Sequence, residues 1–383
     1  MNIDSKLPDV GTTIFTVMSA LAQQHGAINL SQGFPDFDGP AALRERVTHY
    51  INSGFNQYPP MLGAPTLRAA IADKVADLYG ARVDSDTEVT VTAGATEALF
   101  CAICAVVRPG DEVIIFDPAY DSYEPVIRLQ GGITRRVTMR APDFRPDWQQ
   151  FEDLLSDKTR LVILNTPHNP TGTMWDANDM ATLRNLIEDH HCFLVSDEVY
   201  EHIVFDDRRH LSVAGDDILG PRSFVISSFG KTYHVTGWKV GYCVAPAALS
   251  AEFRRIHQFV NFTVNTPMQM GLADFLSQHP EHHLELPAFY QHKRDKFLSL
   301  LAGSRFTWTP AAGTYFQLLD YSEISDEVDL NLAQRWTKEH KLASIPVSVF
   351  YPPGKAPGDR VLRFCFAKDD ETLEQAAEIL CNL

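Results

Sequence analysis

The chain has 383 residues, a formal net charge of −16, 45% hydrophobic residues and 21% charged residues, which excludes a disordered or fibrous protein. The negative charge, with lysines and arginines scattered along the chain, argues against nucleic acid as a partner. The N-terminus lacks a basic start followed by an apolar run, and no apolar run approaches the ~18 residues of a membrane span, so we expect a cytoplasmic protein.

Residues 1–40 are predicted to form an extended arm, because glycine and proline punctuate the segment LSQGFPDFDGP. The arm carries an apolar patch at Ile14, Phe15 and Val17. Gly33 is a candidate for close backbone approach to a ligand, although an ordinary turn glycine explains it equally well.

A helical pattern follows over residues 41–54, and in residues 56–80 a polar, proline-rich loop that carries Tyr58 opens a second helix. From residue 88 onward, short runs rich in Val and Ile alternate with helix-length segments. The runs predicted as strands are EVTVTAG, DEVIIFDP, TRLVILNTP, CFLVSDEVY and RSFVISSF. This alternation predicts a mostly parallel sheet with helices on both faces, a three-layer α/β/α domain.

In such a sheet, ligands bind beyond the carboxyl ends of the strands, so the polar residues that follow each strand are candidate site residues. After the first strand, Gly94, Ala95 and Thr96 open a helix whose free amide groups and positive dipole end would hold a phosphate. After the second strand, Tyr120 presents an aromatic face on which a flat ring could stack.

The third and fourth strands are followed by an amide and a carboxylate. Asn169, in the turn NTPHNPTG, can donate a hydrogen bond to a ring oxygen. Asp197 ends a buried strand, so its carboxylate would suffer desolvation unless a cation such as a protonated pyridine nitrogen met it. Tyr200 can reach the same ligand.

Lys231 follows the fifth strand, in SSFGKTYHVTGWKVG. A P-loop is excluded because Val225 stands where that motif needs glycine. A solvated surface lysine is the ordinary interpretation, but the surrounding glycines and hydroxyls, Ser228 among them, leave room for a phosphorylated ligand. Lys239 can lower the pKa of the Lys231 amine, which makes that amine a better nucleophile. Amine, carboxylate, stacking ring and phosphate cradle together indicate pyridoxal phosphate in Schiff-base linkage to Lys231.

The alanine-rich helix after the first strand also carries Cys101 and Cys104 in a CxxC pattern. No second CxxC occurs in the chain, so buried helix packing is favoured over zinc or redox chemistry, and no metal site is expected.

These motifs, in this order, resemble the fold type I pyridoxal-phosphate aminotransferases of class I/II over essentially the whole chain. The tighter similarity is to the branch of kynurenine aminotransferase, glutamine transaminase K and methionine aminotransferase, carried by LSQGFPDF, NQYPPMLGAPTLR and GTYFQLLD, and within it to the bacterial methionine aminotransferases. The resemblance implies a large cofactor-binding domain over residues 38–276 and a smaller α+β domain over 277–383, which the arm over 1–37 joins.

The resemblance also implies roles. Lys231 would be the Schiff-base lysine and the acid and base that moves the proton, while Asp197 would keep the pyridine nitrogen protonated. The other implied cofactor contacts are Asn169 and Tyr200 at the ring oxygen, Tyr120 on the ring, and Gly94, Ala95, Thr96, Ser228 and Lys239 at the phosphate. Most relatives outside this branch carry arginine in place of Lys239. The lysine keeps the positive charge of that arginine but lacks its bidentate fork. Tyr58 would reach the phosphate of the neighbouring subunit, which implies a homodimer with its active sites at the interface.

Arg363 lies in the strand-like run VLRFCFA, where an unpaired guanidinium would be costly. The family uses this position to fork onto the substrate carboxylate, and a structural ion pair is the alternative. The resemblance also places the Gly33 amide and Asn169 against the substrate. Aspartate-type relatives recognise a distal carboxylate with a second arginine, but none occurs between Arg255 and Arg294.

An apolar, sulfur-tolerant substrate pocket is therefore expected. The residues expected to form it are Ile14, Phe15, Tyr58, Phe259, Phe262 and Val264. We expect methionine to be the preferred amino donor, with aromatic amino acids, glutamine and kynurenine as further donors and a 2-oxo acid as acceptor. A cysteine-S-conjugate β-lyase or a kynurenine–oxoglutarate transaminase as the main activity stays open. A non-catalytic regulator of this fold is disfavoured because all the catalytic residue types are present.

Overall fold

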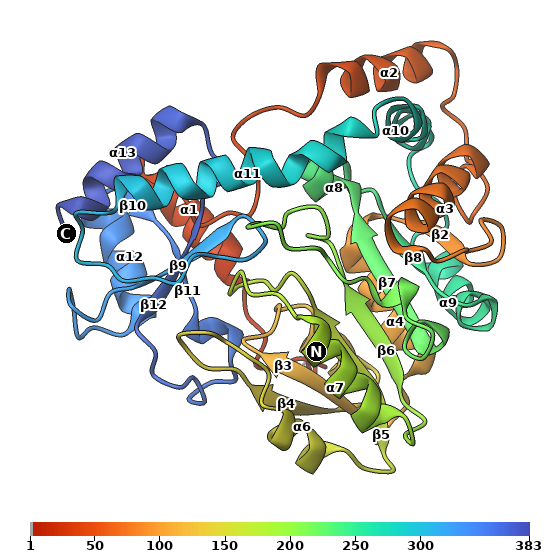
Figure 1. The fold of residues 1–383 in the computed structure, drawn as a ribbon, viewed down its shortest axis with the longest axis horizontal. Coiled ribbons are helices and arrows are strands. Elements are labelled where there is room, and N and C mark those ends of the chain that lie inside the picture. Colours follow the sequence, from red (N-terminus) through yellow and green to blue (C-terminus); the bar gives the residue numbers. More distant parts are fainter. Residues whose placement is uncertain (1–2) are drawn as a thin grey trace.

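The fold is described by a computed structural model over residues 3–383. Within these residues, a seven-stranded sheet with the order β2-β8-β7-β6-β5-β3-β4 lies at the centre of the larger part of the molecule (Figure 1). Its parallel strands are β3 (Glu112–Asp117), β4 (Ile133–Thr138), β5 (Thr159–Asn165), β6 (Phe193–Asp197) and β7 (Ser223–Ser228). Strand β8 (Gly241–Val244) runs antiparallel to both of its neighbours, β7 and β2 (Val89–Thr92).

The predicted mostly parallel sheet is confirmed, and each predicted run contains a strand. Two strands, β4 and β8, are missing from the prediction. Strand β4 has the sequence ITRRVT and lies at the edge of the sheet, where its exposed positions tolerate arginines that a central strand would exclude. Strand β8 is a run of only 4 residues and comes directly after the glycine-rich lysine segment, so its apolar signal is short.

Alternate residues of the central strands face two different hydrophobic cores, which produces the three layers. In β5, Leu161 and Ile163 pack with α4 (Gly94–Val106), while Val162 and Leu164 pack with the core on the other face. The other helices of these layers are α2 (Ala41–Asn52), α3 (Pro65–Tyr79), α5 (Tyr123–Leu129), α6 (Trp148–Leu154), α7 (Ala177–Ile187), α9 (Ala247–Val260) and α10 (Thr266–Gln278). The continuous apolar runs of the strands follow from burial on both faces.

The N-terminal segment is not the extended arm that the sequence predicts. Residues Ile14–His25 form helix α1, which Thr13 caps by accepting a hydrogen bond from the Thr16 amide and which Gly26 ends in a left-handed conformation (φ 58°). Met18 and Ala22, one turn apart, are buried. This spacing is the helical signal, which the glycines and prolines of the following loop obscured.

The C-terminal part contains a smaller antiparallel sheet, with the order β11-β12-β9. Its elements are α11 (Glu281–Leu300), β9 (Phe316–Asp320), α12 (Asp329–Glu339), β10 (Leu342–Ala343), β11 (Ile345–Pro346), β12 (Val361–Cys365) and α13 (Asp370–Cys381). Figure 1 shows α11 extending from the region of α10 to α13.

The N-terminal segment joins this smaller part. Strand β1 (Ile28–Asn29) pairs with β10, and Met18 and Leu30 belong to the same hydrophobic core as Phe364 and Trp336. The domain boundaries at residues 37 and 276 stay predictions. Across residues 3–383, each helix is too short or too polar to span a membrane.

Candidate active site

A pocket opens at the carboxyl ends of the central strands, next to α8 (Phe229–Thr232) and β12. The predicted residues that line it are Phe15, Gly33, Ala95, Thr96, Tyr120, Asn169, Asp197, Tyr200, Ser228, Lys231, Lys239 and Arg363. Segments from both ends of the chain and from its middle therefore meet at the edge of the sheet that strand topology predicts.

Lys231 extends from the short helix α8, directly after strand β7. Its Nζ donates hydrogen bonds to the Gly33 carbonyl oxygen at 2.7 Å and to Tyr315 Oη at 2.8 Å. Burial lowers the pKa of Lys231 to about 8, and the positive charges of Arg363 and Lys239 act in the same direction. A larger fraction of this amine is therefore neutral, and nucleophilic, near neutral pH than for an ordinary lysine.

Asp197 ends strand β6 and is buried, with 4% of its surface exposed. Tyr123 Oη donates a hydrogen bond to its Oδ2 at 2.6 Å, and Asn165 Nδ2 donates to its backbone oxygen at 2.8 Å. Burial raises the pKa of Asp197 to about 6, although the Tyr123 hydrogen bond lowers it. A buried carboxylate of this kind matches a cationic ring nitrogen.

The first turn of α4 forms a cradle for an anion. Gly94 has a φ of 77°, and a Cβ at this position would lie 3.2 Å from Lys239 Nζ. The helix has no side-chain cap, so the first amide groups, those of Ala95 and Thr96 among them, remain available to a ligand. Ser228 lies opposite, at the start of α8, where its Oγ accepts a hydrogen bond from the Gly230 amide.

Arg363 extends from strand β12 and is fully buried. Its Nη1 donates to Asn169 Oδ1 at 2.7 Å and its Nη2 to the Ser31 carbonyl at 2.8 Å, while the guanidinium lies 3.8 Å above the centroid of the Phe316 ring. These partners are an amide, a carbonyl and a ring, which argues against the alternative of a structural ion pair.

The Nε of Arg363 is buried and forms no hydrogen bond with any residue in the range 3–383. Burial also lowers the pKa of Arg363 to about 10. A buried donor without an acceptor is costly, and a substrate carboxylate would supply the missing acceptor.

Some predicted residues lie away from this pocket. Ile14 packs against the core of the C-terminal part, and Val264 is buried in the core of the large sheet. Tyr58 and Phe259 are 81% and 87% exposed, and Tyr58 contacts Phe262 edge to face at 5.6 Å between ring centroids. Of the apolar residues predicted to form the pocket walls, Phe15 is thus the one that lines the pocket within a single described chain. Phe316 and Leu99, which were not predicted, line it as well.

Several residues of the site are missing from the sequence prediction, and three of them contact its charged side chains. Tyr315 holds Lys231, Tyr123 holds Asp197, and Phe316 stacks on Arg363. Tyr315 and Phe316 lie in the GTYFQ run at the start of β9, and Tyr123 follows Tyr120 in AYDSY, so aromatic density near the motifs was the available signal.

Comparisons with known proteins agree with this geometry. The family model for aminotransferase class I and II matches residues 25–380. The chain belongs to the class I and II aminotransferases. Methionine aminotransferase of Escherichia coli is 56% identical over 99% of this chain and 98% of its own length. A kynurenine–oxoglutarate transaminase of Dictyostelium discoideum is 33% identical over 97% of this chain and 94% of its own.

Solved aminotransferases share the whole fold. A methionine aminotransferase from Escherichia coli superposes with a TM-score of 0.97 at 56% identity, with 100% of both chains covered. The N-succinyldiaminopimelate aminotransferase of Mycobacterium tuberculosis superposes with a TM-score of 0.96 at 36% identity, again with 100% of both chains covered.

Aminotransferases of this class use pyridoxal 5'-phosphate. The residues of this chain fit that cofactor, because a lysine with a lowered pKa, a buried carboxylate and a helix N-terminus with free amide groups line one pocket. The uncapped first turn of α4 suits the phosphate, and the Asp197 carboxylate suits the ring nitrogen.

Proposed function

We propose that this aminotransferase takes its amino group from methionine, with aromatic amino acids, glutamine and kynurenine as further donors, and passes it to a 2-oxo acid in two half-reactions. The observation that carries the proposal is that Arg363 and apolar side chains line the same pocket. Arg363 offers an unsatisfied N–H to an α-carboxylate, and Phe15, Phe316 and Leu99 line the same pocket. Among the described lining residues Arg363 is the one arginine, so a distal carboxylate lacks a matching partner.

When bound, pyridoxal phosphate withdraws electrons from the bonds at the substrate α-carbon. The protein supplies the rest. Arg363 would orient the substrate through its carboxylate, and the neutral amine of Lys231 would accept the α-proton at Nζ and later donate it again. Tyr315 and the Gly33 carbonyl hold that amine in place. Asp197 would maintain the positive charge on the ring nitrogen, and the cradle of α4 together with Lys239 would bind the phosphate.

We further propose a cytoplasmic homodimer in which Tyr58 of one subunit reaches the phosphate of the other. The support is a group of exposed aromatic side chains, Tyr58, Phe259 and Phe262, which a soluble monomer would leave in water. An interface there would bring apolar surface to the neighbouring pocket and complete the walls that one chain leaves open.

The test is an absorbance spectrum of the purified holoenzyme before and after addition of methionine without any oxo acid. Conversion of the cofactor into its pyridoxamine form, reversed by a 2-oxo acid, is the expected result. If kynurenine but not methionine converted the cofactor, kynurenine would be the preferred donor and the main activity would be that of a kynurenine–oxoglutarate transaminase.

The β-lyase alternative has its own signature. Release of ammonia from a cysteine S-conjugate, with no lasting pyridoxamine form, would make elimination the main reaction. Accumulation of the pyridoxamine form with that conjugate would contradict it.

A further inference from the structure

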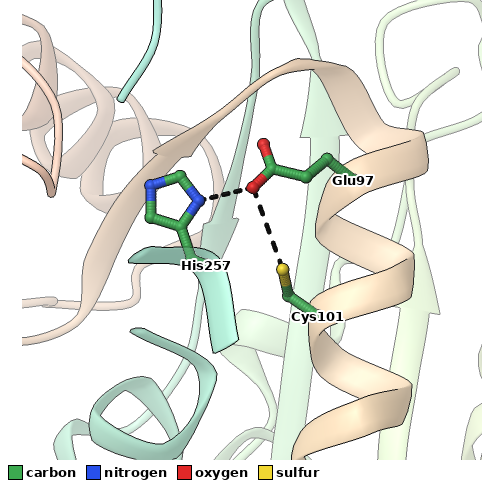
Figure 2. Close-up of side chains that lie close together, drawn as sticks. All are labelled: Glu97, Cys101 and His257. Carbon is green, nitrogen blue, oxygen red and sulfur yellow. Dashed lines mark hydrogen bonds and ion pairs between the residues drawn. The ribbon is translucent and has the colours of Figure 1, made fainter. Parts of the chain in front are cut away.

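A second group of titratable side chains lies behind the phosphate cradle, on the far side of its first helical turn. Glu97 and Cys101 lie one turn apart on α4, and His257 faces them from α9 (Figure 2). Glu97 Oε1 lies 2.5 Å from His257 Nδ1 and 3.8 Å from Cys101 Sγ. All three side chains are buried, and His257 is 0% exposed. Within residues 3–383, the side-chain hydrogen bonds of Glu97 and His257 go to Ala93, Cys101, Met61 and each other rather than to Arg363 or Asn169.

The hydrogen-bond partners of His257 determine how many protons it carries. Its Nδ1 faces the Glu97 carboxylate, and its Nε2 lies 3.0 Å from the carbonyl oxygen of Met61. Both partners are acceptors, whereas a neutral imidazole carries only one N–H. Beside an ionised carboxylate, one of its two nitrogens would therefore point its lone pair at the lone pair of an acceptor oxygen. Two protons satisfy these contacts, one on Nε2 that is donated to Met61 and one in the hydrogen bond between Nδ1 and Oε1, so the buried pair as a whole carries no net charge.

The same distance argues against a metal ion at this cluster. Ligands that share a tetrahedral zinc ion at bond lengths of 2.0–2.3 Å stand roughly 3.3–3.8 Å apart. Glu97 Oε1 and His257 Nδ1 stand closer together than two ligands of one zinc ion, at the separation of a short hydrogen bond.

The pair connects two segments that the cofactor phosphate needs. The second oxygen of Glu97, Oε2, accepts a hydrogen bond of 2.5 Å from the Ala93 amide, at the start of the cradle. Through Met61, His257 holds the loop over residues 57–64, which carries Tyr58. The loop is also anchored at Leu62, whose carbonyl accepts from the Val91 amide at 2.9 Å.

We propose that His257 is a positioning residue for the cofactor phosphate: its proton-bridged pair with Glu97 fixes the first turn of α4 and the Tyr58 loop against each other. The pair also cancels the charge of a carboxylate that would otherwise stand in the turn that binds a phosphate dianion and would repel it. The part of the inference that concerns Tyr58 rests on the proposed homodimer.

The variants that separate geometry from charge can be made at the same two positions. In Glu97→Gln, the amide nitrogen donates to a neutral His257 Nδ1, and the amide oxygen still accepts from Ala93, so both links persist without the shared proton. His257→Leu removes both links and leaves the Glu97 carboxylate buried, unpaired and close to the phosphate. The double variant removes that charge again.

The measurement is the dissociation constant of the apoenzyme for pyridoxal phosphate. We expect a loss of about 30-fold in His257→Leu, a change within about threefold in Glu97→Gln, and a recovery of about tenfold when Glu97→Gln is added to His257→Leu. Equal affinity in His257→Leu and the wild type would overturn the proposal, and so would a loss in Glu97→Gln as large as in His257→Leu.

The matched control is His279→Leu. His279 also pairs with a glutamate, Glu281, at 2.9 Å, but that pair is exposed and remote from the cradle. Loss of this pair should leave the dissociation constant for pyridoxal phosphate unchanged. If His279→Leu weakened cofactor binding as much as His257→Leu, the effect of His257 would reflect general destabilisation of the fold and the proposal would be overturned.

Proton NMR of the wild-type holoenzyme tests the protonation directly, even if His257→Leu fails to fold. The bridging proton should give a far-downfield resonance that is missing in Glu97→Gln. A wild-type spectrum without this resonance would overturn the shared proton.

The link to the neighbouring subunit has a separate test. If His257 acts partly through the Tyr58 loop, Tyr58→Phe should weaken cofactor binding less in His257→Leu than in the wild type. If the two substitutions instead reduced the binding free energy additively, the loop would have no part in the effect of His257. All of these readouts are cofactor binding or spectra, so failure of methionine as a donor leaves them intact, and their failure leaves the proposed amino donor untouched.

Discussion

The cofactor side and the substrate side of the pocket are built in different ways. The lysine, the carboxylate and the phosphate cradle all follow strands of one sheet, so the backbone of that sheet positions them together. The substrate side takes Phe15 and Gly33 from the N-terminal segment and Arg363 from β12 in the smaller sheet. One side is thus positioned by local topology, whereas the other depends on how two parts of the chain pack.

The largest effect should come from the centre of the cofactor side. Lys231→Ala removes the one amine that lies at the end of β7 in the pocket, and we expect it to abolish turnover and the absorbance of the lysine-bound cofactor while the protein stays folded. The measurement is the visible spectrum together with circular dichroism. Lys158→Ala, at an exposed position, is the matched control. Substantial turnover in Lys231→Ala would refute the assignment of this lysine.

Asp197→Asn tests the charge opposite the ring nitrogen. The amide still accepts from Tyr123 but loses the negative charge, and the loss of one partner of a buried charge pair costs about 3–5 kcal/mol. We expect kcat to fall by a factor on the order of 10²–10⁴, measured under saturating cofactor. Tyr123→Phe keeps the carboxylate and should cost about tenfold. An Asp197→Asn enzyme with wild-type kcat would remove the carboxylate from the mechanism.

The lowered pKa of Lys231 predicts a pH profile for cofactor capture by the apoenzyme. Only the neutral amine attacks the aldehyde, so the rate should rise with pH and level off above a midpoint near 8, instead of continuing to the 10.5 of an ordinary lysine. Near neutral pH this shift corresponds to a gain on the order of 100-fold in neutral amine. Stopped-flow absorbance between pH 6 and pH 11, with Nα-acetyl-lysine as reference, would reveal it. A midpoint equal to that of the reference would contradict the effect of burial.

On the substrate side, Arg363→Lys keeps the charge but loses the fork, including the unsatisfied Nε. We expect KM to rise about 10- to 100-fold for both the amino acid and the oxo acid, because both carry the same carboxylate, with a smaller change in kcat. Arg360→Lys, near Arg363 but paired with Asp326 at a partly exposed position, should leave KM unchanged. An unaltered KM in Arg363→Lys would place substrate recognition elsewhere.

The smallest effect is expected where the two sides meet. Tyr315→Phe removes the hydroxyl that accepts from Lys231 Nζ but leaves the Gly33 carbonyl as a second partner. The loss of one hydrogen bond of about 1 kcal/mol should slow the methionine half-reaction about fivefold, as measured by single-turnover absorbance. A loss as large as that of Asp197→Asn would give Tyr315 a direct part in proton transfer.

The contrast between the two sides also explains what could be predicted. Asp197, Asn169 and Lys231 were predictable because each follows a recognisable strand, and parallel strands bring their carboxyl ends to one edge. Helix α1 was missed because the glycines and prolines after it dominate the local pattern. Tyr123 and Tyr315 were missed because an aromatic residue carries no periodic signal of the carboxylate or amine that it will contact.

Local chemistry, written in the order of residues along the chain, was enough to identify the mostly parallel sheet and the class of cofactor and to single out Lys231 as the candidate Schiff-base lysine. Packing between distant segments set the rest: the contact of Arg363 with Asn169, 194 positions away, and the hydrogen bond between Glu97 and His257, 160 positions apart. Strand alternation and helix termini act over a few neighbouring residues and can be recognised in sequence. The pKa of a buried group and the partner of a buried donor depend on every side chain that folding brings within a few ångströms, and that set exists only in the folded chain.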